Sequence, residues 1–143
     1  MSCYLDTSAL AKWYLPEPRS DEFEAFVHNQ PLLLISHLTI CEMRSLLARR
    51  RRMGDLTETE EKAVWDAFLK DRADGVFIIL PMGDAHLLAA TELIDQLADC
   101  SLRTLDALHL AIASQAGATG IASADKVMLH AARAMRLAVH DFS

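Results

Sequence analysis

Apolar and polar positions divide the chain into two alternating kinds of segment. Short apolar runs typical of buried strands lie near residues 2–6, 32–35, 76–80, 119–122 and 137–139. Between them, apolar residues recur at helical spacing over about residues 7–14, 20–29, 37–52, 57–74, 84–97, 104–115 and from 123 onwards. Strands that alternate with helices predict an α/β sandwich around a mainly parallel sheet of four to five short strands.

Small polar residues mark the expected helix starts. The candidate N-caps are Thr7 or Ser8, Ser36, Thr57, Thr104 and Ser123. Thr39-x-x-Glu42 also matches a capping box. We favour Ser36 as the cap of that helix, because this choice leaves Glu42 free to point outward.

Four acids stand at turning points of this pattern. Asp6 ends the first apolar strand and has no partner close to it in sequence, while Glu42, Asp106 and Asp125 lie in early turns of predicted helices. Carboxylates near helix N-termini are stabilised in their ionised form by the helix dipole. Open parallel sheets bind ligands outside the carboxyl ends of their strands, where we expect these acids to meet.

A cluster of ionised oxygens suits a hard cation such as Mg²⁺ or Mn²⁺. Such an ion activates water and stabilises a leaving oxygen, which is the chemistry that phosphodiester hydrolysis needs. The pattern leaves open whether one ion or two are held. Each acid, taken alone, has the alternative interpretation of a helix cap or dipole-compensating residue.

The length and composition are those of an ordinary globular protein. The chain has 143 residues, 52% of them hydrophobic, and we expect one domain over residues 1–143. No apolar run is long enough to cross a bilayer and no signal-like start is present, so we expect a cytoplasmic protein. The net charge of −6 argues against a general nucleic-acid coat, but four of the acids belong to the predicted metal site.

The three cysteines do not form a known metal or redox pattern. Cys3, Cys41 and Cys100 are spaced neither as a zinc knuckle nor as a CxxC pair. We expect reduced thiols, with Cys3 and Cys41 packed in the interior.

Four stretches containing these acids carry a family resemblance. They are Tyr4-Leu5-Asp6-Thr7-Ser8-Ala9-Leu10, Thr39-Ile40-Cys41-Glu42-Met43, Leu102-Arg103-Thr104-Leu105-Asp106-Ala107-Leu108-His109-Leu110-Ala111 and Ser123-Ala124-Asp125. In their order and spacing they resemble PIN-domain proteins, and more closely the VapC-type toxin ribonucleases of type II toxin–antitoxin systems. The resemblance covers nearly the whole chain and implies a PIN-like α/β/α sandwich.

The resemblance also implies a function. It implies a Mg²⁺- or Mn²⁺-dependent endoribonuclease toxin that cleaves RNA, with tRNA or rRNA as the expected substrate. The metal and catalytic residues would be Asp6, Glu42, Asp106 and Asp125, supported by Thr7, Ser8, Arg103 and Ser123. The expected partners are a VapB-like cognate antitoxin and a second copy of the chain, in a heterotetramer or higher complex; no membrane partner is expected.

Other residues allow two interpretations. Arg49-Arg50-Arg51-Arg52 is either an RNA-backbone contact or a solvated helix end, and Arg103 either touches a phosphate or pairs with a nearby acid. His109 lies on the same helical face as Asp106, but its aliphatic neighbours favour a buried, hydrogen-bonded histidine over a metal ligand. Two other functions stay open: a structure-specific DNA nuclease and a non-catalytic RNA-binding PIN-like module.

Overall fold

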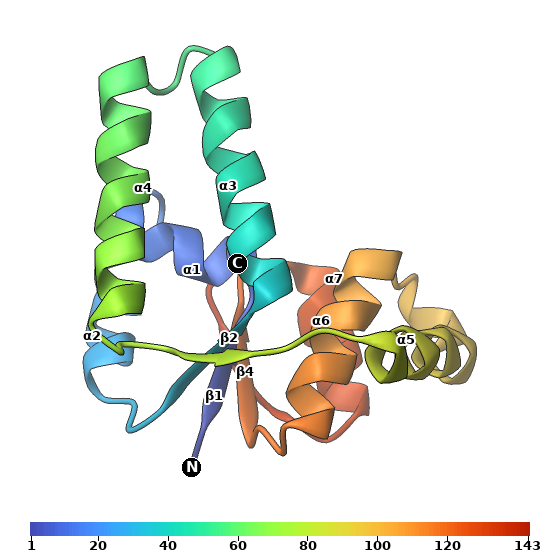
Figure 1. Cartoon of the computed structure of the whole chain (residues 1–143). Coiled ribbons are helices and arrows are strands. Elements are labelled where there is room, and N and C mark those ends of the chain that lie inside the picture. Colours follow the sequence, from blue (N-terminus) through green and yellow to red (C-terminus); the bar gives the residue numbers. More distant parts are fainter.

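A parallel sheet forms the centre of the molecule in the computed structural model, which describes all residues 1–143 (Figure 1). Its strands are β1 (Cys3–Leu5), β2 (Leu33–Ser36), β3 (Ile78–Leu80), β4 (Gly120–Ser123) and β5 (Ala138–Asp141). They lie in the order β3-β2-β1-β4-β5, and every neighbouring pair is parallel. The predicted α/β/α sandwich is therefore confirmed, with β1 at the centre of the sheet.

Seven α-helices cover the two faces of this sheet. They are α1 (Thr7–Tyr14), α2 (Ser20–His28), α3 (His37–Arg52), α4 (Glu58–Ala73), α5 (Asp84–Gln96), α6 (Thr104–Gln115) and α7 (Lys126–Ala134), with one 3₁₀ turn at Ala98–Cys100. Helices α1–α4 lie on one side of the sheet and α5–α7 on the other (Figure 1). No helix combines the length and the apolar character that a membrane span requires.

Each face of the sheet has its own core. One core joins Leu5 and Ile35 of the strands to apolar residues of α1–α4, including the fully buried Phe68. The other joins Tyr4 and Ile121 to residues of α5, α6 and α7. Burying one such large side chain contributes about 1.5–3 kcal/mol, so the strands are held by the helices on both sides. This explains why the strand segments are almost continuously apolar in sequence.

The helix caps differ in part from those predicted. Ser36 caps α3 and Thr57 caps α4, as predicted. Asp6 rather than Thr7 or Ser8 caps α1. Asp125 rather than Ser123 caps α7, and Arg103 rather than Thr104 stands at the N-cap of α6 without a side-chain cap bond. A carboxylate placed just beyond a strand accepts backbone N–H groups as well as a hydroxyl does, which is why two of the predicted caps were wrong by one or two residues.

Helices α3 and α4 form a hairpin that extends beyond the sheet (Figure 1). Glu61 of α4 is buried between them and forms ion pairs with Arg44 and Arg51 of α3. The guanidinium of Arg44 also stacks over the Trp65 ring, 5.3 Å from its centroid. These contacts hold the two helices together where the sheet no longer supports them.

The cysteines are free thiols. Cys3 and Cys100 are buried, and Cys3 packs in the core as predicted. The prediction for Cys41 is wrong, because the outward side of α3 exposes its thiol.

Candidate active site

The order in which the chain adds strands to the sheet reverses next to the central strand β1. From β1 the chain builds β2 and β3 on one side, and then returns to place β4 and β5 on the other. Parallel sheets form a crevice at such a switch point, outside the carboxyl ends of the two strands concerned. Asp6 follows β1 directly and Asp125 follows β4 by two residues, so these two acids flank the crevice.

A pocket of about 330 Å³ opens at this point. All four acids line it, together with nine further residues: Thr7, Ser8, Ser45, Leu46, Arg49, Arg103, Leu105, His109 and Met128. The structure therefore brings Asp6, Glu42, Asp106 and Asp125 to one cavity from four separate segments of the chain. Ser123 lies beneath it, fully buried.

Asp6 is the most enclosed of the acids. Its Oδ1 accepts hydrogen bonds from the Ser8 hydroxyl at 2.8 Å and from the Ala9 backbone N–H at 3.0 Å. Its Oδ2 accepts the Ser123 hydroxyl at 2.6 Å. Asp6 thus has partners two and three residues away, contrary to the sequence expectation. Burial raises the pKa of Asp6, and these hydrogen bonds only partly offset the effect.

Ser8 and Ser123 connect the first strand to the last acid. The Ser8 hydroxyl also accepts the Ala124 backbone N–H at 2.9 Å, and the Ser123 hydroxyl accepts the Asp125 backbone N–H at 2.9 Å. Two hydroxyl side chains therefore fix Asp6 relative to the segment that carries Asp125.

Glu42 is held by groups from two other elements. Its Oε1 accepts the Thr7 hydroxyl at 2.9 Å and a short hydrogen bond with Nε2 of His109. Burial alone would raise the pKa of Glu42, but the bonds from His109 and Thr7 outweigh it, so the pKa is lowered. His109 is buried and hydrogen-bonded as predicted, and it lies directly behind one of the candidate metal ligands.

Tyr4 continues this chain of contacts into the core. Its hydroxyl lies 2.6 Å from Nδ1 of His109, 2.8 Å from the Ser36 hydroxyl and 3.3 Å from the Thr39 hydroxyl. An ionised carboxylate can only accept, so Nε2 of His109 donates to Glu42, and Nδ1 of the same ring has the Tyr4 hydroxyl as its partner. Sequence reasoning missed this role of Tyr4; its only signal was a phenol within an otherwise aliphatic central strand.

Arg103 joins the two remaining acids. Its Nε donates to Oδ2 of Asp106 at 3.0 Å, and a terminal NH₂ group donates to Oδ2 of Asp125 at 2.7 Å. The hydrogen bond and charge of Asp106, followed by the charge of Asp125, raise the pKa of the guanidinium. Of the two predicted interpretations of Arg103, the structure shows pairing with nearby acids.

The acids match a hard cation in chemistry, although most of their oxygens already have partners. Oε2 of Glu42 and Oδ1 of Asp106 make no hydrogen bond within the protein, and neither is enclosed away from solvent. No three His, Cys, Asp or Glu side chains form a ready-made metal cluster. The donor set fits Mg²⁺ or Mn²⁺, and Asp125 would offer its second oxygen once Arg103 moves aside.

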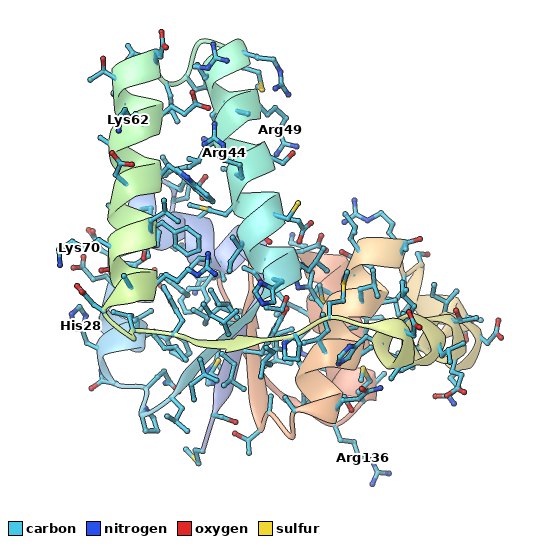
Figure 2. All side chains as sticks on the ribbon, in the orientation of Figure 1. His28, Arg44, Arg49, Lys62, Lys70 and Arg136 are labelled. Carbon is cyan, nitrogen blue, oxygen red and sulfur yellow. The ribbon has the colours of Figure 1, made fainter.

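The four consecutive arginines of α3 fall into different environments. Arg50 pairs with Glu17, and Arg51 pairs with Glu61. Arg49 pairs with no acid and lines the pocket. Figure 2 shows Arg49 on the side of α3 that faces away from α4, whereas Arg44 points toward α4. Arg49 is therefore the member of the cluster that faces the acidic pocket.

The fold and the pocket define a class: a parallel α/β protein with carboxylates gathered at its topological switch point. Residues 3–134 match the family described as PIN domain. The chain therefore belongs to the PIN domain family, which confirms the family predicted from the motifs. No curated protein matches the sequence significantly.

Solved structures with the same fold include proteins of toxin–antitoxin complexes. VapC20 of Mycobacterium tuberculosis, described as a sarcin–ricin loop cleaving toxin, has a TM-score of 0.73 and 18% identity, covering 90% of this chain and 94% of that one. FitAcB of Neisseria gonorrhoeae has a TM-score of 0.70 and 20% identity, covering 96% and 95%. VapBC2 of Rickettsia felis, bound to a DNA fragment from its promoter, has a TM-score of 0.69 and 15% identity, covering both chains fully. At these identities the likeness concerns the fold.

Proposed function

We propose that this PIN-domain protein is a metal-dependent endoribonuclease that acts as the toxin of a toxin–antitoxin pair. The observation that carries the proposal is the pocket itself, which four carboxylates from four segments line at the switch point of the sheet. Asp6 and Asp125 also cap α1 and α7, but capping two helices does not require Glu42 and Asp106 to share the same cavity with them.

Asp6, Glu42, Asp106 and Asp125 would hold Mg²⁺ or Mn²⁺ in this proposal. The bound ion supplies an activated water and charge stabilisation at the phosphate. The hydroxyls of Ser8 and Ser123 hold Asp6, and Thr7 and His109 hold Glu42, so the ligand side chains are oriented before any substrate arrives.

The substrate proposed is RNA. Arg49 at the rim of the pocket is placed to meet a backbone phosphate, and its neighbours Arg50 and Arg51 are engaged by glutamates. The description of VapC20 as a toxin that cleaves the sarcin–ricin loop supports an RNA target for a protein of this fold. We therefore expect tRNA or rRNA as the first substrates to test.

Two protein partners belong to the proposal. The likeness to structures of toxin–antitoxin complexes supports a cognate, VapB-like antitoxin. A second copy of the chain is proposed at α5, whose exposed side includes Leu87, Leu88 and Ile94. Apolar side chains gathered on one helix of a small protein are typical of an interface.

The direct test is cleavage of RNA by the purified chain with Mn²⁺. We predict that Asp106→Asn lowers the rate by about a hundred-fold or more, because losses of merely supporting groups at metal sites cost about 10–100-fold. The fold should persist, since Asp106 has only its bond to Arg103 to lose. Asp84→Asn is the matched control: Asp84 also opens a helix, but it is exposed and lies outside the pocket.

The two other functions give different results in the same assay. Cleavage of flap DNA with RNA left intact would make the protein a structure-specific DNA nuclease. RNA binding without cleavage, and without Mn²⁺ binding in calorimetry, would make it a non-catalytic module. Asp106→Asn protein that cleaves as fast as the unaltered chain would exclude the proposed site.

A further inference from the structure

Arg103 occupies an unusual position for a cation at an acidic site. Its side chain is 70% exposed, yet it contacts two of the four acids, which lie 19 residues apart in sequence (125 minus 106). It stands at the N-cap of α6, and its side chain makes no capping bond there. The guanidinium therefore contacts carboxylates of the pocket and does not cap the helix.

Both carboxylate oxygens of Asp125 already accept hydrogen bonds. Oδ1 accepts the backbone N–H groups of Val127 at 2.8 Å and Met128 at 3.2 Å, which caps α7. Oδ2 accepts Arg103. Since the capping oxygen is tied to the backbone, Oδ2 is the oxygen that Asp125 has to offer a cation. Asp106 differs, because only its Oδ2 contacts Arg103 and its Oδ1 is open.

We propose that Arg103 is a built-in counter-ion that competes with a divalent cation for Asp106 and Asp125. This inference rests on the proposed function. A guanidinium and a divalent cation on the same carboxylate oxygen repel each other, so binding of one weakens binding of the other. The metal affinity of the pocket is then set by the four acids together with the strength of the Arg103 contacts.

The exposure of Arg103 makes this exchange feasible. Ion pairs open to solvent contribute little net stability, and a long exposed side chain can swing into water without a cavity forming behind it. The cation would replace the guanidinium at Oδ2 of Asp125 and leave the capping bonds of Oδ1 in place. Helix α7 therefore does not have to move when the counter-ion changes.

Calorimetric titration with Mn²⁺ at fixed ionic strength tests the proposal. We expect Arg103→Gln to bind Mn²⁺ roughly two- to ten-fold more tightly than the unaltered chain, as removal of one exposed ion-pair competitor allows. Arg103→Lys should lie in between, because an ammonium lacks the fork that reaches both acids at once. Arg49→Gln is the matched control: it removes one positive charge from the same pocket without breaking a contact to an acid, and should change the affinity by less than about two-fold.

A second readout follows Arg103 directly in the unaltered chain. The side-chain N–H resonances of Arg103 should shift on addition of Mg²⁺, as its bond to Oδ2 of Asp125 is lost, while those of Arg50 should not. The proposed competition would be wrong if Arg103→Gln bound Mn²⁺ as tightly as the unaltered chain or more weakly. It would also be wrong if the Arg103 resonances did not shift at saturating Mg²⁺. Neither result would contradict the metal site itself. Absence of Mn²⁺ binding in every variant would overturn the metal site of the proposed function and this inference with it.

Discussion

At the scale of single residues, Glu42 depends on a chain of contacts that runs from the pocket into the core. Its Oε1 contacts His109, which contacts Tyr4, which in turn contacts Ser36 and Thr39. Tyr4, Ser36 and Thr39 are fully buried. A buried polar network with every member satisfied holds its end group in one orientation, and here that end group is a candidate metal ligand.

Tyr4→Phe should therefore affect activity as well as stability. It removes one hydroxyl and leaves Nδ1 of His109 without its hydrogen-bond partner, so we expect the free energy of unfolding to fall by roughly 1–3 kcal/mol. We also expect RNA cleavage to slow by about 10-fold or more, because Glu42 loses part of its orientation. Denaturant unfolding and initial cleavage rates measure the two effects.

Tyr14→Phe separates these effects. The Tyr14 hydroxyl donates to Asp71 at 2.6 Å, at a distance from the acidic pocket. This variant should lose stability by a similar route while cleaving RNA at the original rate below its melting temperature. Equal activity in Tyr4→Phe and Tyr14→Phe would show that the network does not position Glu42.

The candidate acids could be predicted from sequence, whereas their supporting bonds could not. Asp6, Asp106 and Asp125 stand at or near element boundaries that hydrophobic patterning reveals, and Glu42 lies in an early turn of α3. The contact of Tyr4 with His109 joins residues 105 positions apart, and local pattern carries no information about such a pair. The choice between the two interpretations of Arg103 also depended on three-dimensional distances, because a phosphate and a carboxylate attract the same guanidinium.

At the scale of elements, α3 carries two functions on different sides. Arg44 and Arg51 pair with the buried Glu61 and so hold α4, whereas Arg49 lines the acidic pocket. A run of four arginines in sequence suggests one basic patch. The helical turn of 3.6 residues distributes its members around the helix, which is why composition alone could not separate their roles.

Arg49→Gln should weaken RNA binding. We expect a loss of affinity of roughly three- to ten-fold and a smaller dependence of affinity on salt, as removal of one phosphate contact predicts. Fluorescence anisotropy with a labelled RNA at several salt concentrations measures both. Arg52→Gln is the control, since Arg52 is exposed at the end of the same helix and lies outside the pocket. Equal losses in the two variants would indicate a general charge effect and not a contact at Arg49.

Strand β5 gives the fold a dependence on pH. His140 packs against Phe26, with ring centroids 4.6 Å apart, and burial lowers the pKa of its imidazole. The unfolded chain therefore takes up this proton at a higher pH than the folded chain does. The contribution of His140 to stability is fully present above the unfolded pKa of about 6.5 and is lost as the pH falls through that value toward the folded pKa.

His140→Gln should flatten this part of the stability curve. Between about pH 7 and pH 5 the free energy of unfolding should fall less steeply in the variant than in the unaltered chain. Urea unfolding at several pH values gives the slope, and His28→Gln serves as control because His28 is exposed on α2. A slope that stays the same in His140→Gln would show that another group causes the pH dependence.

At the scale of the whole molecule, the sandwich was predictable because the three central strands, β1, β2 and β4, are buried on both faces. Continuous apolar strands separated by helices leave few arrangements other than a parallel sheet between two helical layers. The strand order β3-β2-β1-β4-β5 does not follow from the pattern, since apolar runs of similar length do not specify their neighbours. The hydrophobic pattern also does not predict whether copies of the chain associate, because an exposed apolar residue looks the same in sequence as a buried one.

The exposed side of α5 leads to a prediction about assembly. Leu88 is 68% exposed and lies beside Leu87, which is 49% exposed. If this side of α5 joins two copies of the chain, Leu88→Glu should bury a charge in the interface and convert the dimer to a monomer at micromolar concentration. Light scattering coupled to size-exclusion chromatography measures the mass.

Met53→Glu provides the matched control for Leu88→Glu. Met53 is 66% exposed but stands at the end of α3, at the tip of the hairpin and far from α5 (Figure 1). The two substitutions add the same charge to equally exposed apolar positions, so a change of mass in Leu88→Glu alone assigns the interface to α5. A dimer that persists in Leu88→Glu, or that dissociates equally in Met53→Glu, would place the contact between copies elsewhere on the surface.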